Sequence, residues 1–395
     1  MNITNEFLLM IGKQARKNRE RFWDKNEISV RLSQFKGKSE AGLWFRTQGC
    51  SYDHRGGCLM CDYSTGKHTD ANDMIKYVEN GLNQITFSCN QLLVSPSGSM
   101  LDEKEVPQTA LRGILAALSK TAHNLFSFET RADTITEEKI DICKSYLGER
   151  FYRLFIGLEC ANDWILKYCI NKQLKTDDFS RAIELLKRKN VRVAANILIS
   201  IPFLTDKENI EMAIESVKWA LSSGADECFL FPVHVKKSTP LSVLYEKQLF
   251  SPPSLWSLVE IIHRLGPSYY DRIRLSWYTS YGAYNVLASP YTCSNCYNET
   301  INHLDQFAEY QLASEINYLY NTKCECKEKW KEQLESDPRS AASLPSRVKN
   351  GYKIFAERFL EPDWWNQNSE RLFADMDLES DEFLYAGIGG QYIKR

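Results

Sequence analysis

The sequence predicts an α/β protein: a partial (β/α)6 barrel of parallel strands, followed by a cysteine-rich C-terminal appendage. The barrel is predicted because six β-rich stretches alternate with helical ones and no Rossmann glycine fingerprint is present. The appendage is predicted because this alternation stops near residue 290, where closely spaced cysteines appear. We expect an N-terminal helical extension over 1–40, the barrel over 41–290 and the appendage over 291–395.

Each strand is expected where β-branched and aromatic residues precede a turn sequence. The expected strands are 42–50, 91–99, 125–131, 153–159, 192–202 and 227–235. The helices are expected over 70–82, 105–122, 136–147, 176–190 and 206–224. In such folds the chemistry lies at the carboxyl ends of the strands. These ends carry Cys50, the Ser97-Gly98-Ser99 turn, Glu129 and Glu159.

The composition is that of an ordinary globular protein with 395 residues, 43% of them hydrophobic, and a net charge of -2. This charge gives no support for a polyanionic partner. Two basic stretches, 13–25 and 187–192, are expected to be solvated helix faces, with nucleic-acid contact as the alternative. The apolar run near the N-terminus has only four residues, too few for a signal peptide or a membrane span, so we expect a cytoplasmic protein without a membrane partner.

Twelve cysteines in a reducing compartment are more typical of metal ligands and core positions than of disulfides. We expect the scattered ones to be core residues: Cys89, Cys143, Cys169 and Cys228.

Three cysteines lie within GCSYDHRGGCLMC, residues 49–61, with gaps of seven and two residues. Structural zinc prefers four ligands, and only His54 and His68 lie nearby to complete such a site. Three cysteines with one ligand position missing suit a [4Fe-4S] cluster whose fourth iron is free for a small molecule. The sequence therefore favours an iron–sulfur cluster over zinc at Cys50, Cys58 and Cys61.

Further along the chain, SPSGSMLDEKEVP (95–107), ETRAD (129–133), IGLE (156–159) and INK (170–172) follow in that order. With these motifs the sequence resembles the radical S-adenosylmethionine (SAM) superfamily, although the usual cysteine gaps are three and two. The resemblance covers roughly residues 40–240. It is strongest to the branch containing the catalytic subunit of Elongator and the archaeosine-biosynthesis proteins, and GCSYDHRGGCLMCDY is most similar to the archaeosine group.

The resemblance implies that Cys50, Cys58 and Cys61 hold a [4Fe-4S] cluster whose open iron takes the amino and carboxylate groups of SAM. One electron, from a donor such as flavodoxin or ferredoxin, would then cleave SAM into methionine and a 5'-deoxyadenosyl radical. The radical would abstract hydrogen from a substrate. The cluster supplies this chemistry, and no side chain is assigned a catalytic role beyond binding the cluster, SAM or the substrate.

The resemblance also implies a SAM site. Ser97, Gly98 and Ser99 would meet the methionine ammonium group, although a plain β-turn is the alternative. Glu129 and Arg131 would meet the ribose and the carboxylate of SAM, with a strand-end ion pair as the alternative.

Three further residues, Glu159, Asn171 and Lys172, are expected to contact SAM or the substrate, unless Lys172 is an ordinary solvent-facing lysine. His234 at the end of the sixth strand is a candidate substrate contact, but a lone histidine beside a strand is more typically a satisfied core residue.

A second group of cysteines forms a CxxC pair and a CxC pair, with His303 between them. Four thiols in paired spacing predict a tetrahedral zinc site, with an auxiliary iron–sulfur cluster or unligated thiols as alternatives. The ligands would be Cys293, Cys296, Cys324 and Cys326, with His303 as a spare.

The sequence thus predicts a radical SAM enzyme. The near-neutral charge favours a small-molecule substrate, such as an amino acid, nucleoside or natural-product intermediate. Modification of a tRNA base, with lysine-modified deazaguanine as the family precedent, is the alternative. A non-enzymatic zinc-binding RNA adaptor is a second alternative, but it would have no use for the strand-end motifs.

Overall fold

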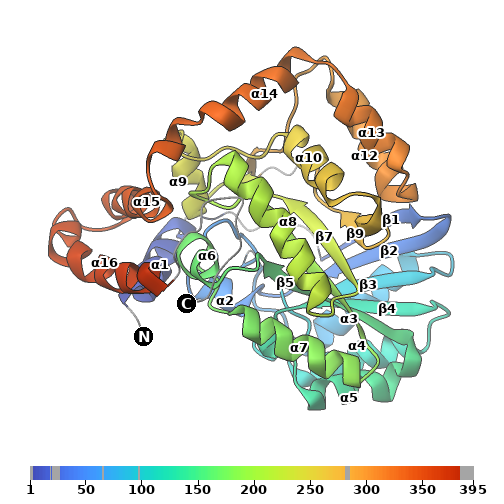
Figure 1. The fold of residues 1–395 in the computed structure, drawn as a ribbon. Coiled ribbons are helices and arrows are strands. Elements are labelled where there is room, and N and C mark those ends of the chain that lie inside the picture. The colour runs from blue at the N-terminus through green and yellow to red at the C-terminus, as the bar shows by residue number, and fades with distance from the viewer. Residues whose placement is uncertain are drawn as a thin grey trace.

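The computed structural model describes residues 3–17, 19, 27–64, 66–96, 98–280 and 285–382. Its centre is an open, curled eight-stranded sheet in the order β1-β2-β3-β4-β5-β6-β7-β9 (Figure 1). Strands β2–β7 and β9 run parallel, and β1 pairs antiparallel with β2. The strands are β1 (Ile28–Phe35), β2 (Lys38–Phe45), β3 (Gln91–Ser95), β4 (Leu125–Thr130), β5 (Phe151–Glu159), β6 (Arg192–Ile199), β7 (Glu227–Pro232) and β9 (Ile273–Leu275).

The six strands expected from the sequence correspond to β2–β7, and the predicted partial parallel barrel is confirmed. Helices cover its outer face (Figure 1). They are α3 (Ala71–Gln84), α4 (Gln108–Ser119), α5 (Glu137–Leu147), α7 (Thr176–Arg188), α8 (Asp206–Ser222) and α10 (Leu255–Leu265).

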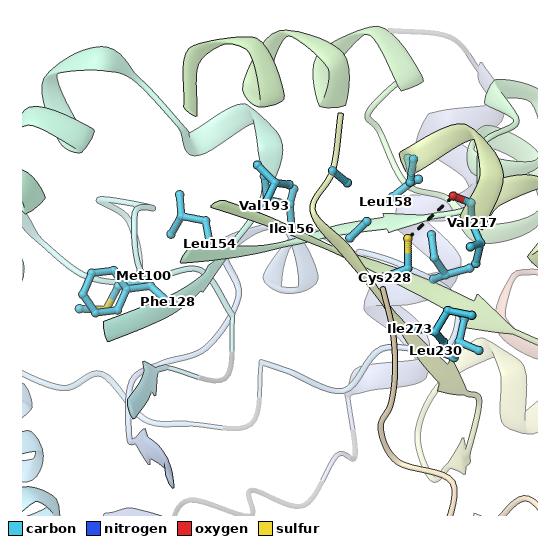
Figure 2. Packing of buried hydrophobic residues seen from close by; sticks show 14 of the residues in the cluster. Met100, Phe128, Leu154, Ile156, Leu158, Val193, Val217, Cys228, Leu230 and Ile273 are labelled. Carbon is cyan, nitrogen blue, oxygen red and sulfur yellow. Dashed lines mark hydrogen bonds between the residues drawn. The ribbon is translucent and has the colours of Figure 1, made fainter. Parts of the chain in front are cut away.

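The main core lies between the sheet and these helices, where Figure 2 shows Leu154, Ile156 and Leu158 of β5. These three side chains are at most 3% exposed. Because successive strand residues point to opposite faces, Arg153 and Phe155 turn toward the inside of the barrel. The four scattered cysteines are also buried, as expected: Cys89, Cys143, Cys169 and Cys228.

The helical character expected for 1–40 holds for α1 (Ile3–Arg16) but is wrong for 28–35, which form β1. A turn at Lys36 and Gly37, both with positive φ, joins β1 to β2. The residues of β1 are half-buried or exposed, so the strand lacks the regular pattern of apolar residues from which a strand is predicted. The sequence also gave no sign of β9, or of the two-stranded sheet of β8 (Val235–Lys236) and β10 (Val286–Ala288).

The C-terminal helices form two groups. Helices α12 (Tyr297–Tyr310) and α13 (Ala313–Asn321) pack together, with α13 against α10, and α14 (Glu325–Ser336) contacts α8. Helices α15 (Leu344–Phe359) and α16 (Trp364–Glu382) pack against α1 at the other side of the molecule (Figure 1). None of the helices in the described ranges is long and apolar enough to cross a membrane.

Candidate functional site

The three-cysteine loop begins where β2 ends. Cys50 precedes the short helix α2 (Ser51–His54), and a turn at Gly56 and Gly57, with φ of 124° and 42°, brings the chain back to Cys58. The Cys50 amide donates to the Tyr63 carbonyl at 3.1 Å. Burial raises the pKa of all three thiols, that of Cys58 to about 12.

The loop does not have the geometry of a single-ion site. Among the described residues, only the four late cysteines form a group of three or more ligand atoms within 4.8 Å of one another. Sulfurs that share one zinc lie about 3.8 Å apart, given Zn–S bonds of about 2.3 Å. A cluster instead offers each cysteine a different iron, and a wider spacing of thiols therefore fits it.

The nearby histidines do not complete a zinc site either. The exposed His54 ring has its Nε2 atom 2.8 Å from the Gln48 carbonyl oxygen, and His68 lies 3.5 Å from the Asp70 carboxylate. The donor set of the loop therefore fits an iron–sulfur cluster better than zinc.

Two arginines near the end of α1 hold this loop. Arg16 and Arg19 both pair with the Asp53 carboxylate, and their side chains are only 8% and 6% exposed. The interpretation of 13–25 as a solvated face or an RNA contact is therefore wrong for these two residues. Their buried partner, Asp53, could not be recognised from the sequence. Residues 20–25 lie outside the described part of the chain.

The expected SAM-binding turn follows β3. Ser97 lies outside the described residues. The amides of Gly98 and Ser99 donate to the Glu105 carboxylate at 3.1 and 2.7 Å. A Cβ on Gly98 would lie 2.8 Å from the Cys50 Cα, so the turn packs directly against the cysteine loop.

Glu105 is a site residue that the sequence analysis missed. It is 1% exposed, and burial raises its pKa to about 7. Its carboxylate also accepts a hydrogen bond from the Thr47 hydroxyl at 2.8 Å. A glutamate shortly after a Gly-Ser turn was the available signal, but only the fold shows that it joins this turn to the segment before Cys50.

Glu129 and Arg131 lie at the end of β4. The Trp44 indole donates to Glu129 at 3.3 Å, and burial raises the pKa of this carboxyl. Arg131 forms a two-pronged ion pair with Asp133 at 2.9 and 2.5 Å, while its Nη1 atom lies 3.9 Å from the Cys50 sulfur. Arg131 therefore forms an ion pair at the strand end, as in the alternative interpretation, but with Asp133, and it also faces the cysteine loop.

The INK segment lies on the other side of the loop. The Lys172 ammonium is 2.5 Å from the Glu159 carboxylate and 8% exposed, so the solvent-facing alternative is wrong. Asn171, in the left-handed region with φ of 60°, donates to the Gly57 carbonyl at 2.7 Å. The Tyr52 hydroxyl donates to the Asn171 carbonyl. This segment therefore supports the loop.

His234 is a satisfied buried residue. Its Nε2 atom lies 2.6 Å from the Trp277 carbonyl and its Nδ1 atom 3.1 Å from the Ser289 hydroxyl. The carbonyl can only accept, so Nε2 carries the proton, and burial lowers the pKa of the ring. Nearby, a pair that the sequence analysis missed joins Lys236 to Asp62 at 2.6 Å.

The four late cysteines come together as predicted. Four of their sulfur–sulfur distances are 3.5 Å, close to the spacing of a tetrahedral zinc site. The Trp256 indole, on α10, lies 3.2 Å from the Cys326 sulfur and ties the group to the barrel. His303 instead pairs with Glu315 at 2.7 Å and is not a member of the group.

Sequence relatives identify the family. An uncharacterised protein of Methanocaldococcus jannaschii is 30% identical over 313 residues, which are 76% of this chain and 83% of that protein. Archaeosine synthase subunit beta of Methanosarcina acetivorans is 30% identical over 296 residues, which are 74% of this chain and 84% of the relative. The chain belongs to the archaeosine synthase subunit beta family. The subunit of the same name from Thermococcus kodakarensis is 27% identical, over 73% of this chain and 90% of the relative.

This membership confirms the resemblance to the archaeosine-biosynthesis branch of the radical SAM superfamily. No protein-family model matches the sequence. Among solved structures, the archaeal Methanocaldococcus infernus Elp3 matches with a TM-score of 0.44 and 15% identity, over 60% of this chain and 59% of that one. Methylornithine synthase matches with a TM-score of 0.44 and 10% identity, over 83% and 91%. The family assignment rests on the sequence relatives.

Proposed function

We propose that this member of the archaeosine synthase subunit beta family is a radical SAM enzyme that modifies a base of tRNA, alongside a partner subunit. The observation that supports it most is the loop of Cys50, Cys58 and Cys61, which lies at the carboxyl end of β2 and packs against the Gly98 turn. When bound there, a [4Fe-4S] cluster supplies the electron, taken from a donor such as flavodoxin or ferredoxin, that cleaves SAM to a 5'-deoxyadenosyl radical.

The chain's own residues then bind and orient SAM. Gly98 lets the turn pack closely against the cysteine loop, because any side chain there would meet the Cys50 backbone. Arg131, beside the Cys50 sulfur, offers a permanent cation for the SAM carboxylate. Glu129, a partly buried carboxylate beside the Trp44 indole, offers acceptors for the ribose hydroxyls. The Lys172 and Glu159 pair borders the same loop and is proposed to face the substrate.

The choice of tRNA over a small molecule rests on the family and on where the cations lie. The near-neutral net charge pointed to a small molecule, whereas two relatives are named archaeosine synthase. Exposed cations lie near the cysteine loop. Arg55 directly follows α2, within the loop, and Lys67 follows Gly66, which packs against the carbonyl of Thr47. The Gln48 side chain donates to the carbonyl of Lys104, whose own side chain is exposed.

The second basic stretch does not join this group. Residues 187 and 188 end α7, and 192 begins β6, so this stretch lies at the amino-terminal edge of the sheet. The cysteine loop lies at the carboxyl edge. We therefore propose the cations around the loop, and not 187–192, as the tRNA contact.

Binding of a tRNA transcript across a salt series tests the proposal. The logarithm of affinity should fall steeply with the logarithm of salt concentration. A triple variant, Arg55→Glu, Lys67→Glu and Lys104→Glu, should flatten the slope by about 2 to 3 and bind at least about tenfold more weakly. The matched control, Lys187→Glu with Arg188→Glu, should behave like the wild type.

Other outcomes would contradict the proposal. No binding at low salt would return the small-molecule substrate to first place. Tight tRNA binding by a protein that never cleaves SAM would instead favour the zinc-binding RNA adaptor.

A further inference from the structure

We propose that Arg16 and Arg19 are positioning residues that fix the cysteine loop from the N-terminal segment and raise the reduction potential of its cluster. This inference rests on the proposed function only in that the loop holds a cluster. It assigns a role to two residues outside the region of family resemblance, which begins near residue 40.

Asp53 is the centre of the arrangement. This carboxylate lies inside the cysteine loop and is 1% exposed. Arg16 Nε lies 2.7 Å from one of its oxygens, and Arg19 Nη1 and the Ser64 amide lie 2.6 and 2.7 Å from the other. Burial alone would raise the pKa of Asp53, but the two guanidinium groups outweigh burial and lower it. Asp53 is therefore charged and fully bonded.

The same two arginines also bind the main chain of the cysteines. Arg16 donates to the carbonyls of Gly56 and Cys58 at 2.5 and 3.2 Å. Arg19 donates to the Cys61 carbonyl at 2.9 Å. Each guanidinium thus joins the buried carboxylate to the backbone of a cluster ligand, which fixes the loop at two of its three cysteines.

Helix α1 is itself held on both sides. A Cβ on Gly12 would lie 1.9 Å from the Gly56 carbonyl oxygen, so the helix touches the loop directly. On its other side, the Phe7 ring packs 5.3 Å from Tyr352 of α15 and 5.0 Å from Trp364 of α16. Helix α1 therefore lies between the cysteine loop and the C-terminal helices α15 and α16 and contacts both.

The arrangement also carries charge. Two arginines and one aspartate leave one net positive charge, shielded from water, beside the loop. Charges interact strongly where water is excluded. Reduction adds a negative charge to a cluster, so a buried cation at this place favours the reduced state and raises the potential.

The test is an anaerobic redox titration of the reconstituted cluster, followed by electron paramagnetic resonance, on the full chain. Arg19→Gln should shift the midpoint potential downward, whereas Asp53→Asn should shift it upward. Arg19→Lys, which keeps the charge, should stay near the wild type. Lys13→Gln, at an exposed position in α1, is the control and should leave the potential unchanged.

Opposite shifts distinguish a charge effect from damage to the loop, which would lower cluster occupancy in both variants without a signed change in potential. Unchanged potentials in loaded Arg19→Gln and Asp53→Asn, or a potential of Arg19→Lys that falls as far as that of Arg19→Gln, would overturn the inference. A wild type that takes up no iron would instead overturn the proposed function.

Discussion

The amide nitrogen of Ser99 lies 2.7 Å from the Oε2 atom of Glu105, a carboxylate that is 1% exposed. The Gly98 amide donates to the other oxygen of the same group at 3.1 Å. One buried side chain therefore shapes the turn that is proposed to bind SAM. Its titration and its neighbours lead to the first two predictions.

Glu105 makes stability depend on pH. Burial raises its pKa in the folded protein to about 7, above the value of about 4.3 in an unfolded chain. The folded state thus holds the proton more tightly, and this contribution is full below about pH 4 and lost as the pH rises to about 7. It amounts to at most about 4 kcal/mol.

We expect the melting temperature of Glu105→Gln, relative to the wild type, to rise between pH 5 and pH 7, because the variant has no charge to bury. Calorimetry at several pH values measures this difference. A difference that stays constant across the range would show that Glu105 does not titrate there.

Gly98→Ala should impair both SAM binding and cluster retention. The new Cβ would lie 2.1 Å from Glu105 Oε2 and 2.8 Å from the Cys50 Cα, and the second atom belongs to backbone that cannot yield easily. We expect SAM affinity to fall at least about tenfold, or about 1.4 kcal/mol, in calorimetric binding, together with a lower iron content.

Gly113→Ala is the matched control, because its nearest neighbour is the end of the flexible Ile75 side chain. It should bind SAM and iron like the wild type. Normal SAM affinity in Gly98→Ala would reduce the Ser97-Gly98-Ser99 segment to an ordinary turn.

The late cysteines should bind one structural zinc. Cys324→Ser removes one of four sulfurs that lie 3.5 Å from their neighbours, so the variant should lose most of its zinc in elemental analysis. Because metal binding contributes folding free energy, α12–α14 should also become sensitive to protease. His303→Ala should keep its zinc, since His303 pairs with Glu315. Iron in place of zinc, or a full zinc content in Cys324→Ser, would refute this site.

Local sequence patterns predicted the parts of the fold with strong periodicity. Strands β2–β7 alternate with amphipathic helices, and the four late cysteines have the paired spacing of a metal site. Strand β1 was missed because its residues are largely exposed and the pairing with β2 depends on a turn at Lys36 and Gly37. Short β9 has only three residues, too few for a periodic signal.

The partners of charged side chains were not predictable. Arg16 and Arg19 belong to a stretch that reads as a basic surface, yet Asp53, more than thirty residues away, buries both. The roles of Glu105 and Lys172 likewise appear only in the folded protein. Glu105 binds the Gly98-Ser99 turn, and Lys172 pairs with Glu159. A sequence shows the charge of a residue, whereas only the fold shows what it is paired with.

The most direct test of the account is Mössbauer spectroscopy with iron and sulfide analysis of the anaerobically reconstituted protein. The account predicts a [4Fe-4S] signature with about four irons held by the loop, loss of that signature when Cys50, Cys58 and Cys61 are all replaced by Ala, and its retention in Cys324→Ser. A wild-type protein without cluster iron, or a signature that survives the triple replacement, would contradict it.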